Sequence, residues 1–600
     1  MLREKHFANR RRLLTLLDRT LLALSITTTA IIFAWLLYYS SYGLNPGDEG
    51  FWLNAMANPF AYPIKIPPNF FDFVFHWPYR WAGGDIAVLR IANVTLTLAL
   101  GWILSFLTVR RLWTVGWPQA VALSGGIASL SLVAFYWWAL TPNYYTLNYQ
   151  AAMMVMIGLL LADRPGRVCE VLGWILVGVG GWCSFMARPA TAAALAVIVM
   201  FYVVALQRKS LLLMLSAALI ALTLVIAICY SIGGGITGLA TSMVKGTEGI
   251  TLLDGGHKVS HILRIDWLET SHSQIAFAAF LATALLLSIF MASKHKLLTS
   301  GVLAAVLIVT ITIVLLGTNP IRIKLSMLFL VPAFTCVGAM FYRRGIILRG
   351  QGLASIVLAL TFLVLPHLLA LSSRVNYWVV GYDACLFWML AAVVFLSPLA
   401  QEGRSVAALM PLTVLAQLLI ASLVNGFMLK PWRQVKDLRA YSAVTTLPGR
   451  GRLMLSQAFH DYLVGARTQA RAAGLEVGTP VIDLANAPTL LYVLETRPLG
   501  LPWLFGGYPG SNALAVKALG VENCADMAKA WVLIAPEGPR HLDYAGVLAS
   551  FGAGKADYVA TASFEVPVIE GYYPNAHRQF LMKPIRSAVT AEQSCLEVRR

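Results

Sequence analysis

About thirteen stretches of this chain are apolar and long enough to cross a hydrocarbon core of roughly 30 Å. Of its 600 residues, 58% are hydrophobic and only 12% are charged, and the mean hydropathy is +0.70. These values lie well outside the range of soluble domains and predict a polytopic α-helical membrane protein. The stretches centre near residues 30, 97, 128, 155, 178, 198, 220, 283, 308, 332, 362, 391 and 416.

Basic residues between the apolar stretches predict the orientation of the chain. Alternate connections, on the same side as the basic segment at residues 1–20, carry Arg or Lys. By the positive-inside rule this side is the cytoplasm. These residues are Arg110, Arg111, Arg164, Arg167, Arg208, Lys209, Lys294, Lys296, Arg343, Arg344 and Arg404. The net charge of +18 therefore reflects membrane orientation, and we expect membrane lipids rather than nucleic acid as partners.

The long connections fall on the opposite side, which in a bacterial inner membrane is the periplasm. They are residues 40–85, residues 231–274 and everything after about residue 428. We therefore expect a transmembrane domain over residues 1–428, whose first periplasmic loop is 40–85, and a periplasmic domain over residues 429–600.

The segment after residue 430 has the composition of a small globular domain. The stretches "PVIDLA", "AWVLIAP" and "DYVATASFEV" predict strands, whereas "RLMLSQAFHDYLVGARTQARAAG" and "YAGVLASFG" predict helices. About 170 residues of this kind suffice for one small α/β domain. Its two cysteines, Cys524 and Cys595, could pair in an oxidising compartment, although their spacing leaves the distance between them open.

Two adjacent acids, Asp48 and Glu49, stand in "NPGDEGFWLN" directly after the first apolar stretch. One interpretation is a helix start, with Asp48 as the N-cap and Glu49 in the first turn. Carboxylates at a membrane boundary are costly, so they are also candidates for function. Because neighbours on a helix point to different faces, one acid can face a cavity while the other serves a polar partner.

An aromatic and proline-rich stretch follows the acids, and further apolar stretches and the C-terminal segment come after it. This organisation resembles the GT-C superfamily of polyprenyl-phosphate-sugar-dependent glycosyltransferases, related to protein O-mannosyltransferases and the lipid A aminoarabinose transferase. The resemblance covers residues 1–200 by motif and the rest of the chain by architecture. It implies that Asp48 is the catalytic carboxylate, with Glu49 beside it.

Two later stretches extend the resemblance. "GGWCSFMARPATAAAL" is similar to a small-residue span that ends in a basic residue, which implies that Arg188 lies at a periplasmic end. In "TPNYYTLNY", Asn143 and Tyr144 stand where several relatives carry a second acid, and we expect Asn143, Tyr144 and Tyr145 to contact substrate. A metal bridged by two carboxylates is therefore not expected at this place, and a divalent cation elsewhere stays open.

Transfer from a lipid phosphate needs only one carboxylate, because this leaving group departs without the general acid that glycoside hydrolysis requires. The acceptor hydroxyl needs a base, and the departing phosphate needs cations. Arginine suits phosphate because its donors form a fork, and interfacial snorkelling is the alternative role for each basic residue. The candidates at predicted periplasmic ends are Arg188, Arg322, Lys324 and Arg374.

Other motifs are weaker. "LPWLFGGYPGS" could stack a sugar on Trp503 or Tyr508, or form a packed loop. The absence of Asp-x-Asp, a Walker loop and a GxGxxG helix start argues against a nucleotide-sugar donor. One periplasmic loop holds three histidines and three acids at no standard zinc spacing, which favours a solvated loop. These residues are Asp254, His257, His261, Asp266, Glu269 and His272.

The sequence thus predicts an inner-membrane glycosyltransferase that moves a sugar, with inversion, from an undecaprenyl-phosphate donor to a periplasmic acceptor. The acceptor would be a hydroxyl of a cell-envelope glycan or glycolipid, such as lipopolysaccharide or O-antigen. One alternative is an O-antigen ligase or polymerase, which would rely on Arg and His in a late periplasmic loop. Another is a non-enzymatic polyprenyl-lipid flippase or transporter, which would require paired discontinuous helices.

The alternation of basic connections generates a topological prediction. A reporter fused after Arg164 should report the cytoplasm, and one fused near residue 440 should report the periplasm. Alkaline phosphatase and fluorescent-protein fusions measure both positions. Two fusions that report the same side would contradict the predicted orientation.

Overall fold

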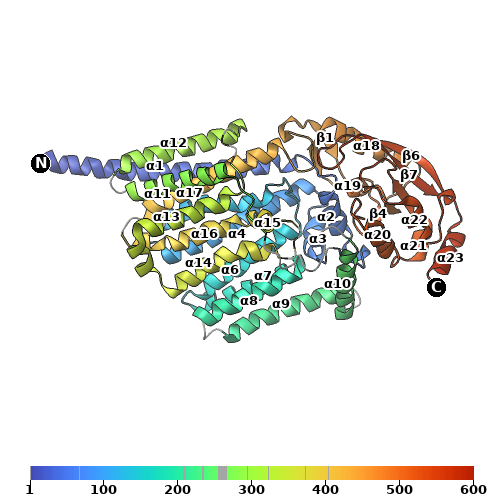
Figure 1. The fold of residues 1–600 in the computed structure, drawn as a ribbon, viewed down its shortest axis with the longest axis horizontal. Coiled ribbons are helices and arrows are strands. Elements are labelled where there is room, and N and C mark those ends of the chain that lie inside the picture. The colour runs from blue at the N-terminus through green and yellow to red at the C-terminus, as the bar shows by residue number, and fades with distance from the viewer. Residues whose placement is uncertain are drawn as a thin grey trace.

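The computed structural model describes residues 2–66, 68–206, 211–232, 235–253, 266–292, 295–319, 321, 323–371, 373, 375–402 and 405–600. Figure 1 shows a bundle of helices at one end of the molecule and a mixed helix and strand region at the other. Two short helices, α2 (Asp48–Ala57) and α3 (Phe71–Trp81), lie between these parts. The predicted fold class, a polytopic α-helical membrane protein with a C-terminal α/β region, is confirmed.

Ten helices in the described part of the chain are long and apolar enough to cross a membrane, judged by length and composition. Residues 15–41 and 117–135 form two of these spans, since short 3-10 segments extend the helices there. The ten helices are α1 (Leu2–Tyr38), α4 (Ile86–Leu112), α5 (Trp117–Ala128), α6 (Tyr144–Ala162), α7 (Arg167–Ala187), α8 (Pro189–Leu206), α9 (Leu211–Ile232), α11 (His272–Met291), α12 (Lys296–Leu316) and α17 (Ser405–Leu429).

All thirteen predicted centres lie in helices, but three of these helices do not meet the same criterion. Helix α13 (Met327–Gly350) is broken by non-helical backbone at Arg343 and ends in basic residues. Helix α14 (Leu353–Leu369) has 17 residues, and α16 (Cys385–Phe395) has 11. Eleven residues span about 17 Å, roughly half of the hydrocarbon core. The predicted count of about thirteen spans is therefore three more than the number of helices, within the described residues, that are long and apolar enough to cross a membrane.

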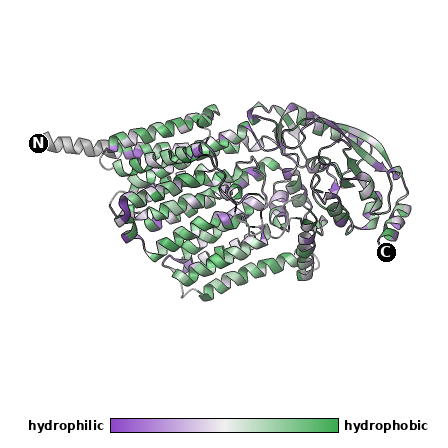
Figure 2. Cartoon of the chain, viewed as in Figure 1, coloured by the Kyte–Doolittle hydropathy of each residue, from purple (hydrophilic) through white to green (hydrophobic). Residues whose placement is uncertain are grey.

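Apolar residues cover the bundle along the whole length of its helices (Figure 2). Hydrophilic residues gather at the end of the bundle that lies farthest from the C-terminal region, and again along the boundary between the two parts (Figure 2). Helix α10 (Gly235–Leu252) runs across the bundle direction at this boundary (Figure 1). The polar boundary is where α2 and α3 meet the C-terminal region, so a functional site is expected there.

The C-terminal region, which we define as residues 430–600, contains two sheets. Strands β1 (Ala443–Thr446) and β2 (Arg452–Leu455) pair antiparallel. The larger sheet has the order β4-β3-β5-β7-β6; β3 is parallel to β4 and β5, and β7 is antiparallel to β5 and β6. Its strands are β3 (Pro480–Asp483), β4 (Arg497–Pro498), β5 (Trp531–Ile534), β6 (Tyr558–Val566) and β7 (His577–Pro584).

The three predicted strands coincide with β3, β5 and β6, and their apolar runs form the centre of the fold because helices cover the sheet. One prediction was wrong: "RLML" is strand β2 and not the start of a helix, because alternate side chains are buried against the β1 pairing. The following helix begins only at Gln457. The helices of this region are α18 (Gln457–Ala472), α19 (Pro488–Val493), α20 (Ser511–Leu519), α21 (Cys524–Lys529), α22 (Tyr544–Ala549) and α23 (Ala588–Val598).

A disulfide joins Cys524 at the start of α21 to Cys595 in α23, with the Cα atoms 5.7 Å apart. It closes a loop of 71 residues and ties the last helix to the sheet. Removing a native disulfide from a small domain usually costs about 2–5 kcal/mol. We therefore expect a Cys524→Ser/Cys595→Ser protein to unfold at a lower temperature than the wild type.

Thermal unfolding with and without reductant measures this effect, and non-reducing peptide mapping checks the bond directly. Reductant should lower the unfolding temperature of the wild type and leave that of the double variant unchanged. Two free thiols in protein purified under oxidising conditions would contradict the bond.

Candidate active site

The loop that precedes α2 is shaped by the side chain of Asn45. Its Oδ1 atom accepts hydrogen bonds from the backbone N–H groups of Gly47 (2.9 Å) and Asp48 (3.0 Å). The residue at the N-cap position is Gly47, and Asp48 is the first residue of the helix. The interpretation of Asp48 as the N-cap is therefore wrong, and the two backbone donors that Asn45 satisfies are those of Gly47 and Asp48.

Glu49 is fully buried and bound by structural partners. Nη2 of Arg90, a residue of α4, lies 2.8 Å from Oε1 and 2.9 Å from Oε2. The hydroxyl of Thr141 donates to Oε1 over 2.5 Å, and the backbone N–H of Asn45 donates to Oε2 over 2.8 Å. The guanidinium of Arg90 also donates to the carbonyls of Ser40, Tyr42 and Gly43. Glu49 therefore anchors the first loop to the bundle and leaves little acceptor capacity for a substrate.

Asp48 points the other way, toward the C-terminal region. Its Oδ2 atom lies 2.9 Å from Nη1 of Arg433, a residue four positions after the end of α17. The side chain of Asp48 remains 32% exposed, whereas that of Glu49 is 0% exposed. Surrounding protein raises the pKa of the Asp48 carboxyl by desolvation, and the nearby guanidinium of Arg433 opposes this shift. Asp48 is thus an accessible carboxylate with a perturbed pKa, which is typical of a general base.

Tyr572 stands beside this ion pair and is held rigidly. Nδ2 of Asn486 donates to the Tyr572 hydroxyl over 3.0 Å, and this hydroxyl donates to the Asn486 carbonyl over 2.7 Å. The guanidinium carbons of Arg433 and Arg540 lie 5.4 and 5.1 Å from the centre of the Tyr572 ring. A Cβ on Gly47 would lie 2.7 Å from this ring, so only glycine permits the close approach.

Helix α19 of the C-terminal region packs directly on α2. The Thr489 hydroxyl donates to the Asn45 carbonyl over 2.7 Å, and Nδ2 of Asn54 donates to the Pro488 carbonyl over 2.8 Å. A Cβ on Gly50 would lie 2.2 Å from the backbone nitrogen of Thr489. The surroundings of Asp48 are therefore built by two parts of the chain more than 380 residues apart.

The predicted substrate residues gather around Arg188. Its guanidinium carbon lies 5.3 Å from the ring centre of Tyr144 and 4.4 Å from that of Tyr145, and Nη1 donates to the Leu369 carbonyl over 3.2 Å. Asn143 instead caps α6, since its Oδ1 atom accepts from the N–H groups of Tyr145 and Thr146.

Of the other predicted cations, only Lys324 lies among the residues that the structure describes. Lys324 is exposed, and its side chain makes no hydrogen bond or ion pair with any residue that the structure describes. Arg322 and Arg374 lie outside the described residues, as do Asp254, His257 and His261. Among the residues described, no group of three His, Cys, Asp or Glu side chains could hold a metal ion.

Sequence reasoning missed Arg433, Arg540 and Lys65. The ammonium of Lys65 pairs with Asp72 and donates to the Pro59 carbonyl over 2.9 Å inside the first loop. Buried Nδ2 of Asn69 and Oδ1 of Asp72 have no hydrogen-bond partner among the described residues, and both residues line a small pocket with Lys65. For Lys65 there was one signal in the sequence, a single Lys in the otherwise uncharged stretch "YPIKIPPN".

Trp503 belongs to a packed loop. It is buried, its indole N–H donates to Oδ1 of Asn486 over 2.6 Å, and its ring lies against Phe505 and Phe51. Of the two alternatives for Trp503, sugar stacking and a packed loop, the structure shows the packed loop. The indole N–H binds Asn486, the residue that also holds the Tyr572 hydroxyl.

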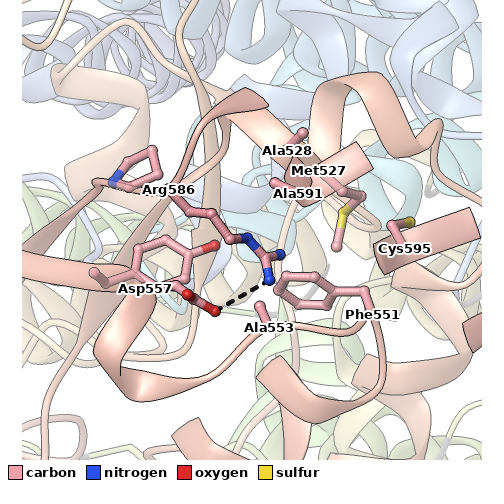
Figure 3. Close-up of a pocket in the computed structure, with 10 residues that line it drawn as sticks. Met527, Ala528, Phe551, Ala553, Asp557, Arg586, Ala591 and Cys595 are labelled. Carbon is pink, nitrogen blue, oxygen red and sulfur yellow. Dashed lines mark ion pairs between the residues drawn. The ribbon is translucent and has the colours of Figure 1, made fainter. Parts of the chain in front are cut away.

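A second small pocket lies in the C-terminal region beside the disulfide (Figure 3). Arg586 and Asp557 form an ion pair of 3.4 Å at its wall, and Phe551 and Cys595 line it. Its interior of about 10 Å³ is room for one water molecule at most. We therefore place the candidate active site at Asp48 and not here.

Comparisons with known proteins give a structural similarity only. No family model matches the chain, and no curated protein matches it. The apo crystal structure of ArnT from Cupriavidus metallidurans shares 14% identity over 93% of this chain and 97% of that chain, with a TM-score of 0.41. The structure of the same ArnT bound to undecaprenyl phosphate shares 13% identity over 94% and 98%, with a TM-score of 0.37. At these TM-scores the functional argument rests on the residues of the site.

The buried position of Glu49 generates a stability prediction. Glu49→Gln keeps the size of the side chain but leaves the Arg90 guanidinium buried without a counter-charge. Breaking a buried ion pair in this way costs about 3–5 kcal/mol, so the unfolding temperature in detergent should fall clearly.

Glu565→Gln is the matched control, because Glu565 pairs with Arg578 on the surface of the C-terminal region. Exposed pairs contribute about 1 kcal/mol or less, so this variant should unfold close to the wild type. A Glu49→Gln protein as stable as the control would show that the pair with Arg90 does not hold the loop.

Proposed function

We propose that this protein is an inner-membrane glycosyltransferase of GT-C type that uses an undecaprenyl-phosphate-linked sugar as donor. The acceptor is a hydroxyl of a periplasmic cell-envelope glycan or glycolipid, such as lipopolysaccharide or O-antigen, and the anomeric configuration is inverted. The N-terminus lies in the cytoplasm, and the C-terminal region lies in the periplasm. Asp48 is the general base, and this assignment extends the resemblance drawn from the sequence.

One observation carries the proposal: of the two adjacent acids, only Asp48 keeps an accessible carboxylate. Glu49 is enclosed by Arg90, Thr141 and the backbone of Asn45. Asp48 reaches the polar boundary between the bundle and the C-terminal region. Two adjacent carboxylates with different surroundings are suited to different roles, and the accessible one is suited to proton transfer.

The reaction requires few groups from the protein. The acceptor oxygen attacks the anomeric carbon, its proton moves to Asp48, and the bond from this carbon to the phosphate oxygen breaks. General-base catalysis of this kind contributes about 10²- to 10⁴-fold in rate. Desolvation brings the pKa of Asp48 closer to neutral pH, which makes its carboxylate a stronger base. Asp48 later releases the proton to water.

Arg188 is suited to the donor side of this reaction. It is buried, and its guanidinium, whose fork of donors suits phosphate, is flanked by the rings of Tyr144 and Tyr145. Asn143 supports them by capping α6. Arg322, Lys324 and Arg374 stay predictions as further phosphate contacts.

Asp48→Asn is the decisive variant. Asn45 supplies the hydrogen bonds at the helix start, and the Asp48 side chain in the lost pair with Arg433 is partly exposed, so the unfolding temperature should stay closer to that of the wild type than for Glu49→Gln. Loss of the base should lower sugar transfer by at least about 10²-fold. Transfer is measured by mass spectrometry of envelope glycans from a deletion strain complemented with each variant.

Glu565→Gln again serves as the control and should restore wild-type glycans. A folded Asp48→Asn protein with near-normal transfer would contradict the proposed base and would favour the O-antigen ligase or polymerase alternative. Glycans that are identical in the deletion strain and the wild type would contradict the transferase itself and would leave the transporter alternative.

A further inference from the structure

Two arginines of the C-terminal region converge on the site, and only one of them, Arg433, pairs with a carboxylate among the described residues. Arg433 follows α17, and Arg540 follows β5, yet both guanidinium groups lie about 5 Å from the same Tyr572 ring. Asp48 interacts electrostatically with both. The neighbouring acids are engaged elsewhere, because Glu49 pairs with Arg90 and Glu570 pairs with Lys436.

The donors of these arginines are only partly used. Nη1 of Arg433 donates a hydrogen bond to Asp48, but the buried Nε of Arg433 has no hydrogen-bond partner in the described part of the chain. The half-buried side chain of Arg540 makes no ion pair and no hydrogen bond with the residues that the structure describes. Guanidinium donors in such a setting are suited to an anionic ligand.

The cluster is also held in place in advance. Arg433 has a left-handed backbone with φ of 52°, a conformation that is rare for residues other than glycine and is often found at functional sites. Backbone packing fixes Arg540, since a Cβ on Gly506 would lie 1.8 Å from the Arg540 carbonyl oxygen. The Tyr572 ring between them is anchored at its hydroxyl by Asn486. Such preorganised cations stabilise developing charge effectively.

We infer that Arg433 and Arg540 form a phosphate-binding subsite that holds the phosphate of the donor lipid beside Asp48. The inference rests on the proposed function and adds to it a substrate contact from the C-terminal region. When the sugar leaves, a phosphodiester with one negative charge becomes a monoester with up to two, so the departing group needs more cations than the ground state does. The two arginines supply them, and Arg433 also pairs with Asp48.

Direct binding tests the subsite without any need for sugar transfer. Purified full-length protein in detergent is titrated with undecaprenyl phosphate, with undecaprenol as the uncharged lipid, and with inorganic phosphate, and the shift in unfolding temperature is measured. The wild type should bind undecaprenyl phosphate at least about tenfold more tightly than undecaprenol or inorganic phosphate. Only undecaprenyl phosphate has both the negatively charged phosphate and the polyprenyl tail.

Arg540→Gln should weaken the binding of undecaprenyl phosphate by at least about tenfold, and Arg540→Lys should weaken it less, because lysine keeps the charge but not the fork. Arg433→Gln should have an effect like that of Arg540→Gln. The charge-matched controls are Lys436→Gln and Arg578→Gln, whose residues pair on the surface, and they should bind like the wild type. The unfolding temperature without ligand shows whether each variant is folded.

Unchanged affinity in a folded Arg540→Gln protein would overturn the subsite, even if sugar transfer by the wild type is demonstrated. Equal affinity for inorganic and undecaprenyl phosphate would also overturn it, because the site would then serve a soluble anion. Arginine-dependent binding of undecaprenyl phosphate by a protein without sugar transfer would support the subsite and contradict only the proposed function.

Discussion

The buried ion pair between Glu49 and Arg90 determines the geometry of the site. Arg90 lies inside the bundle on α4, and its guanidinium binds three backbone carbonyls of the chain that leaves α1, in addition to the Glu49 carboxylate. A buried charge is stable only when its donors and acceptors are satisfied, so the loop is confined to the path that satisfies both groups. The start of α2, and with it the direction of Asp48, follows from this path.

The C-terminal region completes the site. Helix α19 binds the segment of residues 45–54 through Thr489 and Pro488. Gly47, just before α2, and Gly50, within α2, lie where a larger residue would clash. The accessible carboxylate is therefore surrounded by side chains from both parts of the protein. Because Arg433, Arg540 and Tyr572 all come from the later part, a shift of this region would change the charge that surrounds Asp48.

The contrast between the two acids shows how neighbouring residues of the same charge acquire separate roles. Adjacent helical positions point about 100° apart, so one side chain enters the bundle and the other faces the boundary. Glu49 receives a permanent counter-charge and two further donors, whereas Asp48 receives one guanidinium group and an accessible surface. The surroundings thus make one carboxylate structural and keep the other available for chemistry.

Much of the fold could be predicted from local properties of the sequence. The thirteen apolar stretches all coincide with helices, because burial in lipid requires long runs of apolar residues with internally satisfied backbones, whereas α10 lies in a predicted connection. The stretches "PVID", "WVLI" and "YVATASFEV" predicted strands for the same local reason, and the acid pair stood out because charge is rare beside a span. The break at Arg343 and the short α16 could not be predicted from hydropathy, since packing with neighbouring helices stabilises them.

What only the tertiary structure decided is which side chains meet. Asp48 and Arg433 are separated by 385 positions. Nothing in the stretch "KPWRQ", which contains Arg433, or in "GPRHLD", which contains Arg540, indicates that these arginines lie near the first loop. The division of labour between Asp48 and Glu49 was equally undetermined, because it depends on Arg90 and Thr141 reaching one acid and not the other. Hydropathy and local motifs act over a few residues, whereas charges are matched across the whole packed molecule. The sequence by itself therefore determined the long apolar helices, three of the strands and the candidate acids, and the packing of distant segments decided their partners.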